Sequence, residues 1–353
     1  MKFFAFLLLI ALLCAAFAAY LIYVPIGPPA GTSDASAIYV DIAPGTGTQA
    51  IATQLEQAGV VRSRYAFDLL RATRGGKLIA GEYRFNHPAP ATEVYARMVR
   101  GDVYTRTLTI PEGYNIFDIA QAVEAAGLGS RDDFLAAERG QTALIADLAP
   151  GATSLEGYLF PDTYRFARHV APGQILATMV KRFRQVSTQL GLATQPPDTI
   201  AATVTLASLI EKEVSQDSER SLVSSVFTNR LARKMPLATD PSVIYAALLE
   251  GRYRGSIYES DLQAQSAYNT YRHAGLPPGP ICNPSVASLK AALAPAHTDY
   301  FYFVADAQGH SRFSATLEEH AQQVQTYRRA IGRPAPRPTA QSPRRPSHSR
   351  SAK

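Results

Sequence analysis

The N-terminal stretch restricts the topology of this chain more than any other feature. Residues 3–24 (FFAFLLLIALLCAAFAAYLIYV) form an unbroken run without a charged side chain. About 20 apolar residues in a helix are enough to cross a bilayer. Lys2 and the amino terminus favour a cytoplasmic start, so we expect residues 1–24 to be a single-pass anchor in the cytoplasmic (inner) membrane. The alternative is a cleaved signal peptide, because Ala16-Phe17-Ala18 resembles a cleavage site.

The excess of positive charge is confined to the C-terminal tail. The net charge is +6, and residues 333–353 contain six basic residues and no acidic one. Removing these six from the 35 Lys and Arg leaves 29, which equals the number of Asp and Glu. We therefore expect a neutral folded body that does not bind nucleic acid, followed by a disordered, Pro- and Ser-rich basic tail.

The length of 353 residues predicts two folded units rather than one. After a linker at residues 25–36, the pattern at residues 37–108 predicts a small α/β module. Its strand-turn-helix start resembles a LysM-like glycan-binding module, and a structural spacer is the alternative. Residues 109–332 are expected to form a second, mixed domain, which makes the whole an α+β protein behind a transmembrane helix.

A helix expected at residues 199–214 places one carboxylate in an apolar stripe. At about 100° per residue, one face carries Ala202, Leu206, Leu209, Ile210 and Glu213. The opposite, polar face carries Thr205, Ser208, Glu211 and Lys212. We therefore expect Glu211 to face solvent and Glu213 to be buried, where the pKa of a carboxyl rises and the group can act as a general acid. A structural carboxylate, paired with an Arg or exposed to water, is the alternative.

Other polar residues lie where a binding cleft would need them. Asn229 falls in a helix expected at residues 219–234, and Asp240 is placed to cap a helix at residues 242–249. A Pro- and Gly-rich loop at residues 267–284 carries Tyr268 and Asn269. Cys14 and Cys282 are far apart and the seven histidines show no ligand spacing, so no metal site and no cofactor is predicted.

A series of motifs occurs in a recognisable order: SLEGYLFPDTYRF, ASLIEKE, SERSLVSSVFTNRL, MPLATDPSVIY, AYNTYRHAGLPPGPICNP and YFYFVA. Together they resemble the MltG (YceG-like) family of endolytic murein transglycosylases over roughly residue 38 to the end of the last helix. The resemblance implies that Glu213, the second glutamate of EKE, is the catalytic acid. The sequence departs from many lytic transglycosylases directly afterwards, because Val214 replaces a Ser or Thr.

The resemblance also implies a reaction, a place and a set of partners. The substrate would be peptidoglycan glycan strands, cut between N-acetylmuramic acid (MurNAc) and N-acetylglucosamine (GlcNAc) with formation of 1,6-anhydro-MurNAc ends. The catalytic domain would lie in the periplasm or extracytoplasmic space beside peptidoglycan synthases, where it would end nascent strands. We expect substrate-binding roles for Asn229, Asp240, Tyr268, Asn269 and Glu219, and a supporting role for Glu211. The alternatives are a peptidoglycan hydrolase that uses a second carboxylate, a non-catalytic cell-wall-binding scaffold, and a surface protein that acts through its basic tail.

Overall fold

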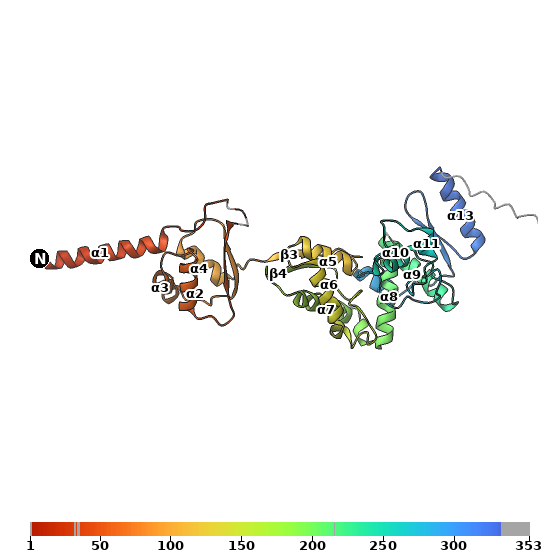
Figure 1. The fold of residues 1–353 in the computed structure, drawn as a ribbon, viewed down its shortest axis with the longest axis horizontal. Coiled ribbons are helices and arrows are strands. Elements are labelled where there is room, and N and C mark those ends of the chain that lie inside the picture. The colour runs from red at the N-terminus through yellow and green to blue at the C-terminus, as the bar shows by residue number, and fades with distance from the viewer. Residues whose placement is uncertain (1, 32, 34–35, 215, 333–353) are drawn as a thin grey trace, which may run out of the picture. The chain divides into compact units, whose positions relative to one another are not determined.

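The computed structural model describes residues 2–31, 33, 36–214 and 216–332 (Figure 1). The predicted basic tail, residues 333–353, lies outside the described residues. The fold is a mixed α+β arrangement in which the named strands form three antiparallel pairs. The chain divides into two compact units. The first comprises Met1–Ile110, Ile119–Ala137 and Asp162–Leu176, and the second Pro111–Asp118, Glu138–Pro161 and Ala177–Lys353.

Helix α1 (Lys2–Tyr23) is the apolar helix expected at the N-terminus. It is long and apolar enough to cross a membrane. Its side chains are largely exposed, including Phe3 and Phe17, and Ile22 near its end is the buried one. Arg62 donates a hydrogen bond of 3.1 Å to the carbonyl of Pro25 and lies over the ring of Tyr20, which ties the end of α1 to the module that follows.

The rest of the first unit begins with a strand–helix–helix–strand module. Strands β1 (Ile38–Ile42) and β2 (Gly81–Phe85) pair antiparallel, with Val40 opposite Tyr83. Helices α2 (Thr48–Gln57) and α3 (Arg64–Arg74) lie between them in sequence, and α4 (Ala91–Arg100) follows. Their apolar side chains form one buried cluster. The alternating strand pattern and the helical spacing therefore predict these strands and helices correctly.

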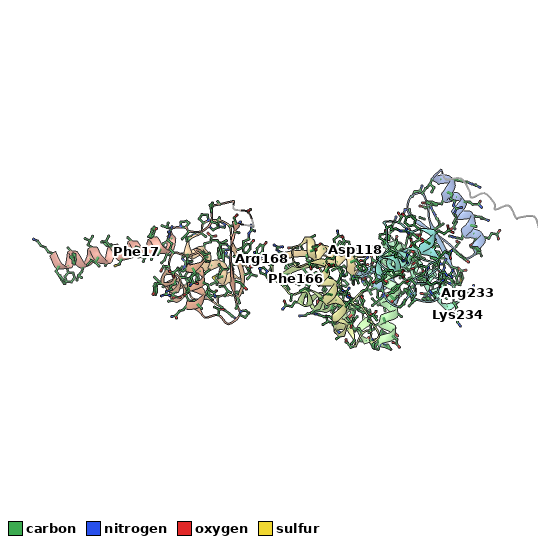
Figure 2. The ribbon with its side chains drawn as sticks, viewed as in Figure 1. Phe17, Asp118, Phe166, Arg168, Arg233 and Lys234 are labelled. Carbon is green, nitrogen blue, oxygen red and sulfur yellow. The ribbon has the colours of Figure 1, made fainter. Side chains whose placement is uncertain are left out.

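A second strand pair completes the first unit. Strand β3 (Arg106–Thr109) pairs antiparallel with β4 (Thr163–Phe166). Arg168 lies just beyond β4 (labelled in Figure 2). It donates a hydrogen bond of 2.7 Å to Glu82 and lies 3.8 Å from the centre of the Tyr39 ring. Helices α5 (Ile116–Ala125), α6 (Arg131–Gly140) and α7 (Pro172–Gln189) each have residues in both units.

The second unit is built around α8 (Pro197–Glu213), which packs against α9 (Arg220–Ala232), α10 (Asp240–Leu249) and α12 (Val286–Leu293). Its buried apolar cluster includes Leu209, Ile210, Phe227 and Tyr245. The remaining elements are η2 (Thr142–Ile145), η3 (Leu192–Thr194), η4 (Asp217–Glu219), α11 (Glu259–Leu262), the hairpin β5 (Tyr302–Ala305) and β6 (Ser311–Ser314), and α13 (Leu317–Ala330).

The prediction of an apolar and a polar face on α8 is wrong in part. Thr205 and Ser208, expected on the polar face, are 4% and 0% exposed, whereas Ala202 of the apolar stripe is exposed. Helices pack against α8 on several sides, and both hydroxyls are satisfied by backbone carbonyls of the same helix at 2.8 and 2.7 Å. A helix surrounded by neighbours buries its small polar residues as well as its apolar ones.

Candidate active site

Glu213 is the last residue of α8 and lies in a cleft of about 410 Å³. The cleft is formed by the end of α8, by α9, by the loop before α10, and by β5 and α13. Its lining residues are Glu213, Phe227, Arg230, Leu237, Ala238, Thr239, Asp240, Tyr271, Tyr302, Phe303, Leu317 and His320. The volume falls within the range of small-molecule sites, roughly 300–1,000 Å³.

The surroundings of Glu213 favour its protonated form. Burial, and to a lesser degree the negative charge of Asp240, raise the pKa of the carboxyl to about 7, while the positive charge of Arg230 opposes this shift. A carboxyl with this pKa exists in both protonation states near neutral pH. It can therefore give a proton to a bound molecule and take one back.

Asp240 and Tyr271 form a hydrogen-bonded pair in the same cleft. The Tyr271 hydroxyl donates to the Asp240 carboxylate at 2.7 Å. The expectation that Asp240 caps the following helix is wrong: α10 begins at Asp240 itself, Thr239 is the residue before it, and no side chain caps the helix. Asp240 is exposed and lines the cleft. Its hydrogen-bond partner is Tyr271, which also lines the cleft, and not a backbone N–H of the helix N-terminus.

Arg230 on α9 connects the segment before β5 with the loop before α10. Its Nε donates to the carbonyl of Phe301 at 2.7 Å, and its Nη1 donates to the carbonyl of Leu237 at 2.7 Å. The guanidinium also lies 5.4 Å from the centre of the Tyr302 ring. These contacts fix one positive charge among carbonyl groups near Glu213, and burial lowers the pKa of Arg230. Arg230 is not among the residues predicted from the sequence, although the motif TNRL places it next to Asn229.

Another part of the lining comes from the C-terminal part of the chain, from residues that were not predicted to lie near Glu213. The rings of Tyr302 on β5 and His320 on α13 are stacked, with centres 5.2 Å apart and planes 23° apart. Leu317, one turn before His320, is 64% exposed beside them. No local pattern identifies these residues, because only the packing of α13 against the hairpin brings them to the cleft.

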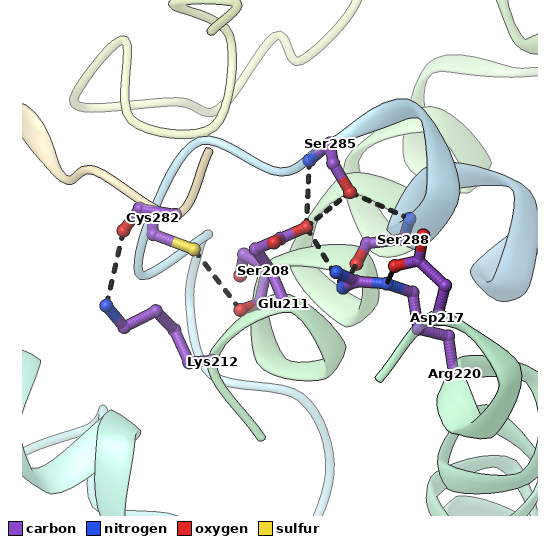
Figure 3. A network of polar contacts seen from close by, with 9 residues as sticks. Ser208, Glu211, Lys212, Asp217, Arg220, Cys282, Ser285 and Ser288 are labelled. Atoms are coloured by element: carbon purple, nitrogen blue, oxygen red, sulfur yellow. Dashed lines mark hydrogen bonds and ion pairs between the residues drawn. The ribbon is translucent and has the colours of Figure 1, made fainter. Parts of the chain in front are cut away.

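Glu211 holds the carboxyl end of α8 in place, and the expectation that it faces solvent is wrong. Its side chain is 6% exposed and lies 3.3 Å from the guanidinium of Arg220. It accepts hydrogen bonds from the backbone N–H and the hydroxyl of Ser285, at 2.9 and 2.6 Å (Figure 3). Arg220 also donates to Ser288 at 2.6 Å. Glu211 thus connects α8 with the first turns of α9 and α12, two residues before Glu213.

Three predicted substrate-binding residues have partners elsewhere in the second unit. Asn229 donates to the carbonyls of Thr298 and Tyr300 at 2.8 and 2.9 Å. Asn269 is fully buried and donates to the carbonyls of Leu262 and Ala264. Glu219 accepts from the backbone N–H of Ser311 at 3.1 Å and lies 3.4 Å from His310. The structure places none of these three in the lining of the Glu213 cleft.

Tyr268 lies at a different cavity, of about 190 Å³, beside the buried carboxyl of Glu156. Glu156 is 2% exposed and accepts hydrogen bonds from the backbone N–H of Ile116 and the side chain of Asn283, both at 2.9 Å. Burial raises the pKa of Glu156 to about 8. The ring of Tyr268 packs 5.2 Å from that of Tyr245 on α10. Helix α8 contributes to both sites, because Thr205 lines this cavity and Glu213 lines the cleft.

Among the described residues, no group of three or more His, Cys, Asp or Glu side chains is arranged to hold a metal ion. Cys282 is buried with its Sγ 3.3 Å from the carbonyl of Ser208 (Figure 3), and Cys14 is exposed on α1.

Comparison with known proteins relates this chain to one family. The profile of the YceG-like family matches residues 40–326. An endolytic murein transglycosylase of Bacillus subtilis (strain 168) is 32% identical over 85% of this chain and 87% of its own length. One from Streptococcus pneumoniae serotype 2 is 29% identical over 81% of this chain, which spans 58% of that relative. The crystal structure of a yceG-like protein of Listeria monocytogenes is 33% identical, covers 81% of this chain and 98% of its own, and has a TM-score of 0.53.

Proposed function

This chain belongs to the YceG-like family, and we propose that it is an endolytic murein transglycosylase that cuts the glycan strands of peptidoglycan. The relatives named above carry that activity in their names. The observation that carries the proposal is the position of Glu213: a carboxyl with a pKa near 7, in a cleft of adequate size, beside Asp240 and Arg230.

Glu213 would act twice in one reaction. The protonated carboxyl gives its proton to the glycosidic oxygen while the bond from that oxygen to the anomeric carbon of MurNAc breaks. The resulting carboxylate then takes the proton of the 6-hydroxyl of the same sugar as O6 bonds to the anomeric carbon. One bond breaks, one forms and no water is consumed, which leaves a 1,6-anhydro-MurNAc end and a free GlcNAc hydroxyl. A pKa near the working pH suits a group that must both donate and accept.

The neighbours of Glu213 have distinct parts in this proposal. The Asp240 carboxylate, held by Tyr271, faces the cleft and would stabilise positive charge that develops on the sugar ring. Glu211 is a positioning residue, because its contacts fix the last turn of α8. We assign Asn229, Asn269 and Glu219 to holding the surrounding loops, and Tyr268 to a more distant part of the binding surface.

Anchoring and domain organisation extend the proposal. Helix α1 fits a single-pass anchor, and we place the rest of the chain on the extracytoplasmic side, near peptidoglycan synthases. We keep the division into a linker at residues 25–36, a module at 37–108 and a catalytic domain at 109–332. The order β1–α2–α3–β2 supports a LysM-like, glycan-binding module. Loss of glycan binding by a chain whose residues 37–108 are replaced with an unrelated spacer would support that role.

The proposed function is tested by the chemistry of the released fragments. The full chain in detergent is incubated with purified peptidoglycan, and the products are identified by mass spectrometry. We expect fragments one water lighter than reducing sugars, and at least a hundredfold less product from Glu213→Gln. Glu259→Gln is the matched control, because Glu259 is exposed on α11 and does not line the cleft; it should act like the wild type.

One alternative has a specific observation in its favour. Asp240 is a second carboxylate in the same cleft, and two carboxylates are what a glycoside hydrolase uses. Reducing ends instead of anhydro ends, lost with either Glu213→Gln or Asp240→Asn, would establish hydrolysis. A wild-type chain that binds glycan but releases no fragments would instead indicate a non-catalytic cell-wall-binding scaffold.

A further inference from the structure

Part of the cleft lining comes from the C-terminal hairpin and α13, and this part contains Tyr302, Phe303, Leu317 and His320. The ring of His320 stacks on Tyr302, whose other neighbour is the guanidinium of Arg230. The Nδ1 atom of His320 is buried and has no hydrogen-bond partner among the described residues. The ring nitrogen left to meet a molecule in the cleft is therefore Nε2.

A capping box holds the first turn of α13, the turn that carries His320. Thr316 precedes α13, and its hydroxyl accepts from the N–H of Glu319 at 3.2 Å, while the Glu319 carboxylate accepts from the N–H of Thr316 at 3.2 Å. This reciprocal pair holds the first turn. Leu317 and His320 are three residues apart and therefore lie on one face of the helix, which is the face at the cleft. Farther along α13, Gln323 donates to the carbonyl of Phe313 on β6 at 3.2 Å, which fastens the helix to the hairpin.

We propose that His320 is a substrate-binding residue: its Nε2–H donates a hydrogen bond to an oxygen of an amino sugar, while the stacked rings of Tyr302 and His320 form the wall against which that sugar packs. This inference rests on the proposed function, because it takes the occupant of the cleft to be a glycan. Amino-sugar chains present hydroxyl and N-acetyl oxygens beside apolar ring faces, and the wall offers a donor beside two rings and the exposed Leu317.

The charge state of the imidazole fits this role. Burial and the nearby Arg230 both lower the pKa of His320, so the ring is neutral near neutral pH. With Nδ1 buried and unpartnered, the tautomer that carries its proton on Nε2 avoids leaving a buried N–H without an acceptor. A neutral donor also leaves the proton of Glu213 as the one that takes part in the reaction.

The test separates binding from turnover. The affinity for purified glycan strands freed of stem peptides is measured by calorimetry in the full chain carrying Glu213→Gln, which keeps position 213 uncharged and stops the reaction. Adding His320→Phe preserves the stacking and removes the nitrogen, so we expect the Kd to rise about tenfold. His320→Gln places an amide near the position of Nε2 and should recover part of this loss. His169→Phe, which changes an exposed His of the first unit, should leave the Kd unchanged.

Each result decides the assignment. An unchanged Kd for His320→Phe, or the same loss for His169→Phe, would overturn it, as would a Glu213→Gln parent that binds no glycan. A lowered thermal midpoint with equal loss in His320→Phe and His320→Gln would mean that His320 only supports the fold of α13. Failure of the proposed function is seen separately, as a wild-type chain that yields no anhydro ends although the His320 variants alter binding.

Discussion

Tyr271 donates its hydroxyl proton to Asp240 across 2.7 Å, and this bond joins the loop that follows α11 to the first residue of α10 at the Glu213 cleft. Burial and the neighbouring carboxylate both raise the pKa of Tyr271, so the phenol stays protonated and remains a donor. The orientation of the Asp240 carboxylate, whose charge raises the pKa of Glu213, therefore depends on a residue 31 positions away.

Removing this hydroxyl should lower activity with little effect on stability. In Tyr271→Phe the ring remains and Asp240 loses its hydrogen bond. Because one hydrogen bond contributes about 0.5–1.5 kcal/mol, we expect kcat/KM to fall roughly threefold to tenfold. Formation of anhydro ends is the measurement, and the thermal midpoint is the control. A wild-type rate in Tyr271→Phe would mean that Asp240 needs no orientation for the reaction.

The pH dependence of activity should report the pKa of Glu213. The reaction needs the protonated carboxyl, and burial raises its pKa from 4.5 to about 7. Activity should therefore fall as the pH rises through about 7. Because the charge of Asp240 contributes to raising this pKa, Asp240→Asn should move the basic limb to lower pH. A limb that does not move in the Asp240→Asn profile would contradict the electrostatic coupling.

The buried ion pair between Glu211 and Arg220 should contribute to the free energy of unfolding. Glu211 and Arg220 are 6% and 9% exposed in their side chains, and removing one partner of a buried pair costs about 3–5 kcal/mol. We expect a loss of that order in Arg220→Met, measured by urea unfolding in detergent. Arg100→Met is the control, since Arg100 and its partner Asp102 are 58% and 45% exposed and exposed pairs contribute about 0–1 kcal/mol.

The double variant Glu211→Met with Arg220→Met checks the cause of that loss. Removing both charges leaves no unpaired buried charge, so the double variant should be more stable than Arg220→Met alone. Equal instability of the two would show that Arg220 acts through its bonds to Ser288 and Asp217 instead.

Glu156 should make stability depend on pH between about 4.5 and 8. Burial raises its pKa in the folded state from 4.5 to about 8, so in this interval the folded chain holds a proton that the unfolded chain has lost. The stabilisation is complete below about pH 4.5 and is lost as the pH rises to about 8, at most about 1.4 kcal/mol per pH unit. Glu156→Gln should flatten this slope even if it lowers stability overall. Parallel slopes for wild type and variant, measured by urea unfolding, would contradict the assignment.

The sequence by itself determined the parts whose signal is local. The uncharged run at residues 3–24 predicted α1, and alternation in the strands with helical spacing between them predicted β1, α2, α3 and β2. Helical periodicity also predicted that Glu213 is shielded from solvent. The order of motifs identified the family that the comparisons then showed.

Only the tertiary structure decided what surrounds these elements. Periodicity assumes one buried and one exposed face, so it misplaced Glu211, Thr205 and Ser208, which become buried because helices pack on several sides of α8. Likewise, the partners of Asp240 and the wall formed by Tyr302 and His320 come from segments distant in sequence. Their positions depend on how separate elements pack together, because a spacing along one helix carries no information about which other segment will face it.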